Sequence, residues 1–315
     1  MKVHHKIDSL PVFRNAVITI GTFDGVHTGH NQIIQQMKAV AASNSGETVI
    51  ITFHPHPRKI VTNSSQEVSL LTTLHEKTAL LDAAGIDHLV VVPFTEAFAS
   101  LSANDYIEQF LVKRFLPHTL IIGYDHRFGK GRSGDFTLLE SYAEKKVFNL
   151  VEIPEHLIQE AAVSSTRIRH ALKDGDIIST NKLLGYPYFF EGTVTEGNKL
   201  GRTIGYPTAN LQIEETEKLI PANGVYAVTV QLEQFSEKLN GMMNIGIRPT
   251  VGGKNRVVEV NIFYFDKDIY GKNLLVNVIA YIRAEQKFDG LDALKNQLAN
   301  DKENAIRILG NSQTY

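Results

Sequence analysis

The sequence predicts an α/β plus β arrangement, in which an α/β domain with a parallel sheet precedes a smaller antiparallel β domain. From residue 15 to about 183, short runs of β-branched residues alternate with helical patterns, which is typical of βαβ units on a parallel sheet. After LGYPY, residues 184–188, strand-like runs are separated by turns containing Gly and Pro, with little helical pattern before residue 289. The 315 residues suffice for two ordinary domains. We therefore place the domains at residues 1–185 and 186–315.

The first half is expected to hold five strands. Each is a continuous apolar run rather than an alternating one, as expected where helices cover both faces of a sheet. The runs are residues 16–20, 49–53, 88–92, 119–122 and 147–151. Apolar residues repeat at helical spacing between these runs, so helices are expected around residues 33–41, 78–84 and 106–115.

The second half is expected to form an antiparallel sheet or a small closed barrel. Its strand candidates are residues 189–195, 225–232, 241–247, 257–265 and 274–283. A C-terminal helix is expected to follow and to pack on this sheet through Leu291, Leu294, Leu298 and Ile306.

Composition and charge exclude several classes of function. Lys and Arg total 32 and Asp and Glu 34, so the chain offers no broad attraction for nucleic acid or an anionic membrane. Cysteine is absent, which excludes disulfides, thiolate metal sites and cysteine nucleophiles. No stretch approaches the roughly 18 apolar residues of a membrane helix, and the first ten residues lack the apolar core of a signal peptide. We expect a cytoplasmic protein whose partners are small molecules.

A glycine-rich turn follows the first strand. Residues 21–30 read GTFDGVHTGH and lead directly into a predicted helix. Backbone amides in such a turn can approach a phosphate, and the helix N-terminus adds partial positive charge. His27 and His30 can both point at that anion. A metal site is the alternative for paired histidines, but HExxH is absent and no cysteine could assist, so a polyphosphate is favoured.

A second candidate anion site is SSTRIR, residues 164–169. We expect this segment to open a helix that ends near Leu172, with Ser and Thr as N-caps. Arg167 and Arg169 beside such a cap would oppose the helix macrodipole unless an anion lay between them.

Together these motifs resemble a known enzyme superfamily. HxGH after the first strand and SSTxxR late in the domain are similar to the nucleotidylyltransferases, which have a Rossmann-like parallel sheet. FHPHP, residues 53–57, and GYDHRFG, residues 123–129, narrow the resemblance to the FAD synthetase module of prokaryotic bifunctional riboflavin kinase/FAD synthetases. The resemblance implies that FMN and ATP are converted to FAD and pyrophosphate.

The resemblance also implies residue roles. His27 and His30 would contact the ATP phosphates and the transition state, while Ser164, Thr166 and Arg169 would hold the β- and γ-phosphates. Such catalysis is electrostatic and needs no protein nucleophile. Further residues expected to face the nucleotide or the flavin are Gly21, Phe23, Asp24, Gly25, Gly29, Phe53 and Asp125.

One residue departs from the family pattern. The family usually has Phe where this chain has His126. Three consequences stay open: weaker FMN binding, a pH dependence near neutrality, or a tolerated exchange of one aromatic ring for another.

A second constellation lies in the β half. Residues 191–211, EGTVTEGNKLGRTIGYPTANL, are rich in glycine, which by itself can reflect no more than the corners of a barrel. Thr208 and Asn210, however, offer two neutral oxygen ligands on one side of an extended segment, which suits a hard cation held mainly by phosphates and water. Glu259 interrupts an apolar strand. It is either a surface-facing residue or a general base for an alcohol nucleophile.

These segments, with NIGIRPT (residues 244–250), resemble the riboflavin kinase domain, a six-stranded barrel. The resemblance implies that Thr208 and Asn210 bind Mg2+ with ATP, that the Gly201 and Arg202 loop covers the phosphates, and that Glu259 deprotonates the ribityl 5′-hydroxyl. Arg283 and Phe288 would border the flavin. Asn261 stands where relatives commonly have His, and Tyr206 where many have Phe.

The combined expectation is a bifunctional enzyme. It would phosphorylate riboflavin to FMN and then adenylylate FMN to FAD, with ATP and Mg2+ in the reaction. Two alternatives stay open: a chain in which only the kinase is fully active, and a flavin- or nucleotide-binding sensor without turnover.

Overall fold

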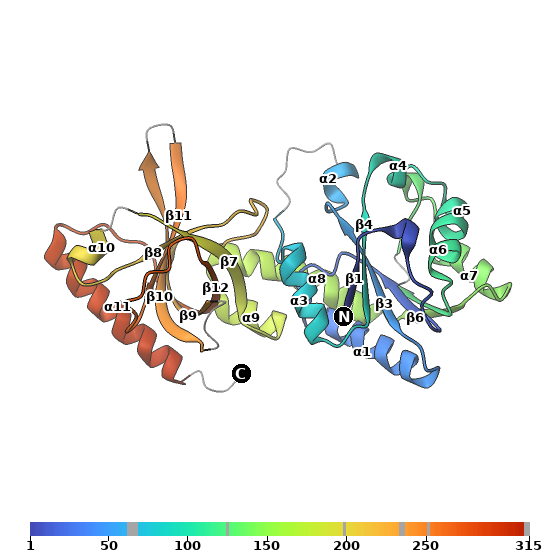
Figure 1. Ribbon diagram of the computed structural model, residues 1–315, viewed down its shortest axis with the longest axis horizontal. Coiled ribbons are helices and arrows are strands. Elements are labelled where there is room, and N and C mark those ends of the chain that lie inside the picture. The colour runs from blue at the N-terminus through green and yellow to red at the C-terminus, as the bar shows by residue number, and fades with distance from the viewer. Residues whose placement is uncertain (62–68, 124–125, 198–199, 233–236, 251–252, 312–315) are drawn as a thin grey trace. The chain divides into compact units, whose positions relative to one another are not determined.

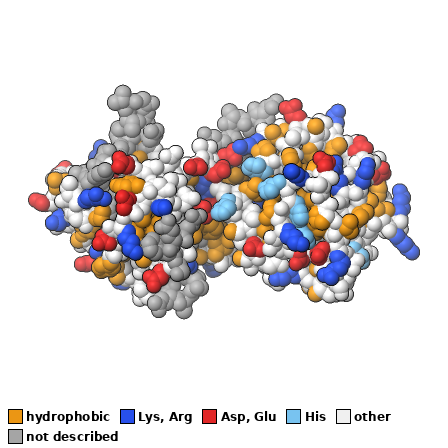
Figure 2. All heavy atoms as spheres, viewed as in Figure 1, with side chains coloured by type: hydrophobic (Ala, Val, Ile, Leu, Met, Phe, Trp, Pro, Cys, Tyr) orange, Lys and Arg blue, Asp and Glu red, His pale blue; other side chains and the backbone are white. Residues whose placement is uncertain are grey.

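The computed structural model describes residues 1–61, 69–123, 126–197, 200–232, 237–250 and 253–311 (Figure 1). The chain divides into two compact units, Met1–Ser165 and Thr166–Tyr315, called here the first and the second unit. No helix within the described residues has both the length and the apolar character needed to cross a membrane. On the face shown in Figure 2, acidic and basic side chains are interspersed, in keeping with the near-zero net charge.

The first unit is built on a parallel sheet of six strands in the order β1-β4-β3-β2-β5-β6. The strands are β1 (Lys2–His4), β2 (Val17–Ile20), β3 (Thr48–His54), β4 (His88–Pro93), β5 (Thr119–Gly123) and β6 (Asn149–Ile153). The predicted α/β class is confirmed, but the prediction of five strands is wrong by one. The missed strand, β1, has three residues and lies at the sheet edge beside β4, so it has no apolar run to reveal it.

Alternate residues of these strands enter two apolar cores, one on each face of the sheet. Ile18, Ile51 and Val90 belong to one core, while their neighbours Val17, Ile50 and Leu89 belong to the other. The helices of the unit are α1 (Thr28–Ser43), α2 (Arg58–Val61), α3 (Leu74–Ala83), α4 (Glu96–Ala99), α5 (Ala103–Asp105), α6 (Lys113–Phe115) and α7 (Phe136–Glu144), with a π-helical segment at Tyr106–Val112. Burial on both faces explains why each strand reads as a continuous apolar run.

The strand order places a natural binding position at the end of β2. The chain passes from β2 to β3 on one side and later adds β5 on the other side. At such a reversal the loops leaving the carboxyl ends of the strands diverge and open a crevice, which is where doubly wound sheets bind ligands. The glycine-rich turn at residues 21–27 leaves β2 at this point.

The predicted helix start at Ser164 is wrong. Helix α8 runs from Glu155 to Asp174, so SSTRIR lies inside it rather than at its N-terminus. Helix formers occupy residues 159–162 (QEAA), and Glu155 in the first turn complements the macrodipole. Arg167 and Arg169 therefore do not lie beside a helix N-terminus and do not oppose its macrodipole.

The second unit contains a closed antiparallel barrel, as the sequence predicts. Its strand order is β10-β11-β8-β7-β12-β9. The strands are β7 (Tyr188–Thr195), β8 (Ala209–Gln212), β9 (Gly224–Leu232), β10 (Leu239–Thr250), β11 (Gly253–Ile262) and β12 (Asn273–Arg283). Two helices flank it, α9 (Ile177–Leu184) and α11 (Leu291–Asn311), and α10 (Leu200–Thr203) is a single turn.

Helix α11 packs on the barrel, but the face that it buries differs from the predicted one. Leu298, Ala305 and Leu309 share a core with Ala227 and Met242. Leu291 and Ile306 are instead 55% and 38% exposed, so their predicted packing is wrong. The stripe through residues 298, 305 and 309 follows the spacing of a helix face, and Ile306 lies one position off it.

Residues 166–185 group with the barrel unit. Asn181 of α9 donates a hydrogen bond to the Val278 carbonyl and accepts one from the Tyr188 backbone N–H, at 3.0 and 2.7 Å. These bonds fasten α9 to β12 and to the start of β7. The domain boundary at residues 185/186 stays a prediction.

Candidate active sites

The turn after β2 is fixed by a buried carboxylate. Asp24 is 3% exposed and accepts hydrogen bonds from the backbone N–H groups of Leu71 and Thr72 at 3.0 Å each. The Thr72 hydroxyl also lies 3.0 Å from the N–H of Gly25, which has φ +85°. The carboxylate thus ties the turn to the segment that precedes α3. The expected contact of Asp24 with the nucleotide stays a prediction.

His27 and His30 lie together at the start of α1. His27 is fully buried and forms the N-cap, with Nδ1 accepting from the His30 N–H at 3.4 Å. The two rings stack with centroids 3.8 Å apart. The other nitrogen of His27, Nε2, lies 2.8 Å from Ser165 Oγ. This last contact brings the SSTRIR segment to the HTGH segment, although the two lie far apart in the sequence.

The imidazole of His30 is held neutral. Burial moves its pKa well below the usual value, and the positive charges of His27 and Lys77 act in the same direction. Its Nδ1 atom is buried and has no hydrogen-bond partner among the described residues. The site therefore presents a buried polar atom that the described residues leave unpaired.

Lys77 of α3 is a residue that the sequence reasoning missed. It is 8% exposed, and burial lowers the pKa of its ammonium while the charge of Asp24 opposes this shift. A usable indication was present in the sequence. Lys77 lies between Leu74 and Leu81 at helical spacing, so a lysine occupies a position on the apolar face of the helix.

An aromatic cluster lies beside the β3 end in the first unit. Phe53 contacts Phe94 and Phe98, with ring centroids 5.4 and 5.7 Å apart, and Tyr106 stacks on Phe128 at 4.8 Å. His126 lies 5.7 Å from the Phe128 ring centroid. Such a cluster suits a planar ligand ring.

His126 does not titrate near neutrality. Burial, with the charges of Arg132 and Arg127, lowers its pKa to about 4. The open expectation of a pH dependence near neutrality is therefore wrong for this residue. Its Nε2 is buried without a hydrogen-bond partner in the described part of the chain.

The remaining predicted residues of the first site are placed as follows. Gly21 directly follows β2, Phe23 is buried with φ +47°, and Gly29 is buried in α1. In α8, Thr166 is exposed and Arg169 half-buried, and both belong to the second unit. The Ser164 side chain and Asp125 lie outside the described residues.

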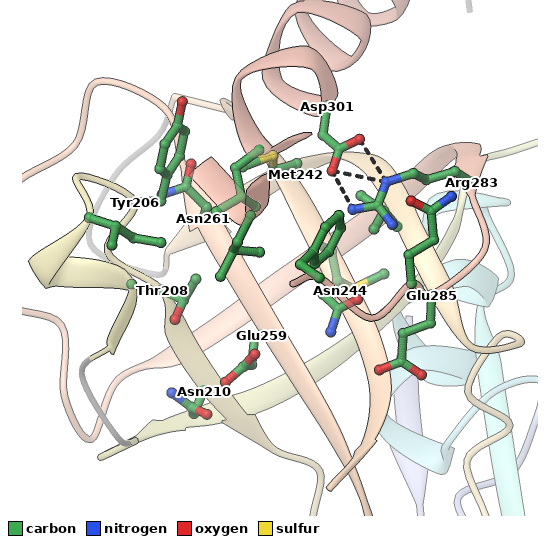
Figure 3. A pocket seen from close by; sticks show the side chains of 18 residues that line it. Tyr206, Thr208, Asn210, Met242, Asn244, Glu259, Asn261, Arg283, Glu285 and Asp301 are labelled. Atoms are coloured by element: carbon green, nitrogen blue, oxygen red, sulfur yellow. Dashed lines mark hydrogen bonds and ion pairs between the residues drawn. The ribbon is translucent and has the colours of Figure 1, made fainter. Parts of the chain in front are cut away.

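In the barrel, strand register brings the predicted residues together. β11 lies between β8 and β10, and Glu259 pairs directly with Asn210 on one side and Asn244 on the other. Directly paired residues point to the same face of a sheet. Figure 3 shows these three side chains in one pocket with Thr208, which lies two residues before Asn210. Asn244 is a pocket residue that the sequence reasoning did not single out.

The pocket has a volume of about 270 Å³ and is partly apolar. Gly201, Tyr206, Met242 and Phe288 line it together with Arg283. The Arg283 guanidinium binds the buried carboxylate of Asp301 in α11, with its Nη2 2.7 Å from Oδ2 (Figure 3). It also lies over the Phe288 ring, 5.6 Å from the centroid. Arg283 is thus fixed by two partners.

A second cavity of about 510 Å³ adjoins the same segment. It shares Thr208 with the first pocket and is lined also by Arg202 and Pro207. Thr208 therefore lines two hollows, and each of them has both acidic and basic side chains in its lining.

Close backbone approaches explain glycines of the loop before β8. A Cβ built at Gly197 would overlap Asn210 Nδ2, and one built at Gly201 would overlap the Tyr206 carbonyl oxygen. Asn261 of β11, 6% exposed, donates a hydrogen bond to the Pro207 carbonyl at 2.6 Å. These contacts hold the segment that carries Thr208 against the strand that carries Glu259.

The oxygen-bearing side chains of the barrel pocket fit a cation that is held mainly by phosphate and water. Thr208, Asn210 and Glu259 supply oxygen atoms to one pocket. Within the described residues no group of three or more His, Cys, Asp or Glu side chains could hold a metal by itself. This donor set matches Mg2+ that receives most of its ligands from phosphate and water.

Comparisons with known proteins cover both units. A family model for FAD synthetase matches residues 10–167, and one for riboflavin kinase matches residues 184–309. Proteins named bifunctional riboflavin kinase/FMN adenylyltransferase are 37% identical in Listeria monocytogenes, over 92% of this chain and 91% of the relative, and 36% identical in Escherichia coli K12, over 97% and 96%. A crystal structure of a Streptococcus pneumoniae protein, described as a macrolide-efflux protein, is 30% identical with a TM-score of 0.84, over 96% of this chain and 97% of that one. The chain belongs to the family of bifunctional riboflavin kinase/FMN adenylyltransferases.

Proposed function

We propose that this chain converts riboflavin and ATP to FMN and ADP in the barrel, and FMN and ATP to FAD and pyrophosphate in the first unit. The observation that supports this most directly is the presence of two unlike constellations. In the barrel, the Glu259 carboxylate lies between the amides of Asn210 and Asn244. In the first unit, the imidazoles of His27 and His30 stack at the N-terminus of α1.

In the barrel, Glu259 acts as the general base. It takes the proton of the ribityl 5′-hydroxyl as the hydroxyl oxygen attacks the γ-phosphorus of ATP. The bond between that phosphorus and the β–γ bridging oxygen breaks, and ADP leaves. Arg283 and Phe288 border the flavin, while Arg202 and the second cavity receive ATP. The observation that supports this role is that Glu259 lines the same pocket as Thr208 and Asn210.

Thr208 and Asn210 would hold Mg2+ that enters with ATP. The ion supplies positive charge that offsets the negative charge of the phosphate oxygens. The two side chains themselves orient this end of the nucleotide toward Glu259. Because both are neutral, they add no repulsion toward the phosphates.

In the first unit, the residues stabilise charge and form no covalent bond. A phosphate oxygen of FMN attacks the α-phosphorus of ATP, the bond to the α–β bridging oxygen breaks, and pyrophosphate leaves. His27, His30 and the first N–H groups of α1 face the phosphates, and Ser164, Thr166 and Arg169 hold the leaving group. The aromatic cluster with Phe53 receives the flavin.

Stoichiometry tests this proposal. Purified protein receives ATP and Mg2+ with either riboflavin or FMN, and ADP, pyrophosphate, FMN and FAD are measured. We expect one ADP for each flavin phosphorylated when riboflavin is supplied, and one pyrophosphate for each FAD when FMN is supplied. Flavin binding without release of ADP or pyrophosphate would overturn the proposal and favour a sensor.

A further inference from the structure

Lys77 is a buried cation without a partner in the described part of the chain. Only 8% of the residue is exposed, and its hydrogen bond there is the backbone one to Thr73. The ammonium itself has no hydrogen bond or ion pair among the described residues. Burying an unpaired ammonium is unfavourable, so such a group is retained where a partner arrives later or where it serves a function.

The carboxylate whose charge acts on Lys77 is already engaged in other hydrogen bonds. The negative charge of Asp24 raises the pKa of Lys77 and so opposes the effect of burial. The Asp24 carboxylate, however, accepts hydrogen bonds from the Leu71 backbone and from both the backbone and the hydroxyl of Thr72. Asp24 thus holds the chain before α3 against the glycine-rich turn. It does not neutralise Lys77 by an ion pair.

The same contacts bring Lys77 to the start of α1. Leu74 and Leu81, which flank Lys77 on its face of α3, belong to one apolar core with Phe23 and Val26 of the turn and Ile33 of α1. Lys77 therefore lies on the face of α3 that packs toward the turn and α1.

A second buried polar group at this place also has no partner. His30 Nδ1 is buried without a hydrogen bond in the described residues, and the charge of Lys77 acts on the His30 ring. His30 stacks on His27, the N-cap of α1. A cation whose charge acts on His30, the buried unpartnered nitrogen of that imidazole and the amides at the start of a helix of 16 residues thus belong to one part of the unit. Each of them is stabilised by an anion.

We propose that Lys77 is a phosphate-binding residue of the adenylyltransferase site, and that its ammonium contacts the polyphosphate of ATP bound at His27, His30 and the N-terminus of α1. This inference rests on the proposed function of that site. Phosphate would give Lys77 the counter-charge that Asp24 does not supply, and Lys77 would add a full positive charge beside the neutral imidazole of His30, which offers only a dipole.

Lys77→Met is the informative variant, because it keeps an apolar stem of similar length and removes the charge. If Lys77 serves nucleotide binding, the variant without ATP melts at the same temperature as the unmodified protein or higher, because an unpaired buried charge is gone. A structural role for Lys77 predicts a lower melting temperature.

Lys38→Met is the matched control. Lys38 is a half-buried lysine of the same unit, and its Nζ donates to the Ala84 carbonyl at 3.0 Å. Its removal deletes a structural hydrogen bond without touching the turn. Lys77→Arg tests whether charge alone suffices at the position.

The experiment measures FAD formation from FMN at varied ATP, with riboflavin phosphorylation by the same preparation as an internal reference. For Lys77→Met we expect kcat/KM for ATP in FAD formation to fall about 10- to 100-fold, the range of a lost charged hydrogen bond. Riboflavin phosphorylation should stay within about twofold, and Lys77→Arg should recover part of the loss. Lys38→Met should alter melting only.

Two results overturn the inference while leaving the proposed function intact. One is an unchanged kcat/KM for ATP in Lys77→Met. The other is a loss that comes with a lower melting temperature and is matched by Lys38→Met. If the unmodified protein forms no FAD at all, the proposed function of the site itself fails, and the inference falls with it.

Discussion

Glu259 is placed by backbone register, which puts Asn210 and Asn244 on either side of it. An amide at position 259 would keep the shape of the side chain but could not accept the ribityl proton. We expect Glu259→Gln to lower kcat for riboflavin phosphorylation by at least about 100-fold, because general bases contribute roughly this much. Formation of FAD from supplied FMN should stay within about twofold.

Glu191→Gln is the control for that exchange, because Glu191 is a half-buried glutamate in β7 of the same barrel. It should leave riboflavin phosphorylation nearly unchanged. If Glu259→Gln phosphorylates riboflavin at the normal rate, Glu259 is not the base.

His126 links stability to pH. Its pKa is about 4 in the folded protein and near 6.5 in an unfolded chain, so the unfolded state binds the proton first as pH falls. The free energy of unfolding should therefore be unaffected by this group above about pH 6.5, and should decline below that by at most about 1.4 kcal/mol per pH unit until about pH 4.

His126→Phe removes this dependence. The stability of the variant relative to the unmodified protein, measured by urea unfolding, should rise as pH is lowered from 6.5 to 4.5. The pH profile of FAD formation between about 6.5 and 8 should keep its shape. A stability difference that is the same at every pH would contradict the assignment.

At the scale of elements, an ion pair joins the end of β12 to α11. Asp301 is fully buried and binds Arg283 through two guanidinium nitrogens. Removing one partner leaves the other charge uncompensated, so Asp301→Ala should lower the free energy of unfolding of the barrel by about 3–5 kcal/mol. It should also raise KM for riboflavin, because Arg283 loses its fixed orientation.

Chemical unfolding and riboflavin kinetics measure both effects. Arg307→Ala is the control. Arg307 is exposed on α11 and donates a hydrogen bond to Asn304 of the same helix. Equal stability of Asp301→Ala and Arg307→Ala would show that the buried pair does not hold the helix.

Asn261 connects β11 with the segment that carries Thr208, through its bond to the Pro207 carbonyl. Asn261→Ala should lower kcat/KM for ATP in riboflavin phosphorylation by about 10-fold, because small displacements of a binding group reduce productive alignment. Asn261→His should retain most activity, since an imidazole N–H can donate to the same carbonyl. If both variants behave alike, the hydrogen bond does not position Thr208.

The elements that the sequence predicts well are those with strong local patterns. The β2, β3, β4 and β5 runs are apolar because both faces of the sheet are covered, and the barrel strands alternate with glycine and proline turns. The edge strand β1 has no such pattern. SSTRIR misled the prediction because Ser and Thr are good N-caps, yet the preceding residues 155–163 extend the helix.

At the scale of the whole molecule, each candidate site combines a local motif with distant partners. HTGH and PTAN are each a run of consecutive residues, so each motif could be recognised in the sequence. Asn244 and Asp301 come from other elements and meet these motifs only through folding, so no local spacing reveals them. Lys77 is visible in the sequence only as a lysine on an apolar helix face, and that pattern does not show which motif it approaches. Sequence therefore predicts the chemistry of each site better than its surroundings.

The stacked imidazoles of His27 and His30 and the barrel carboxylate of Glu259 lie in different units, each with its own core. The product of the barrel reaction is the substrate of the reaction in the first unit. FMN should therefore form before FAD, and one time course can follow both products.

The most direct test is a time course with riboflavin, ATP and Mg2+, in which riboflavin, FMN and FAD are separated chromatographically. The account predicts that FMN appears first, without a lag, and that FAD follows after a lag and accumulates at the expense of FMN. Accumulation of FMN without FAD would contradict the adenylyltransferase assignment, and unchanged riboflavin with folded protein would contradict the central claim altogether.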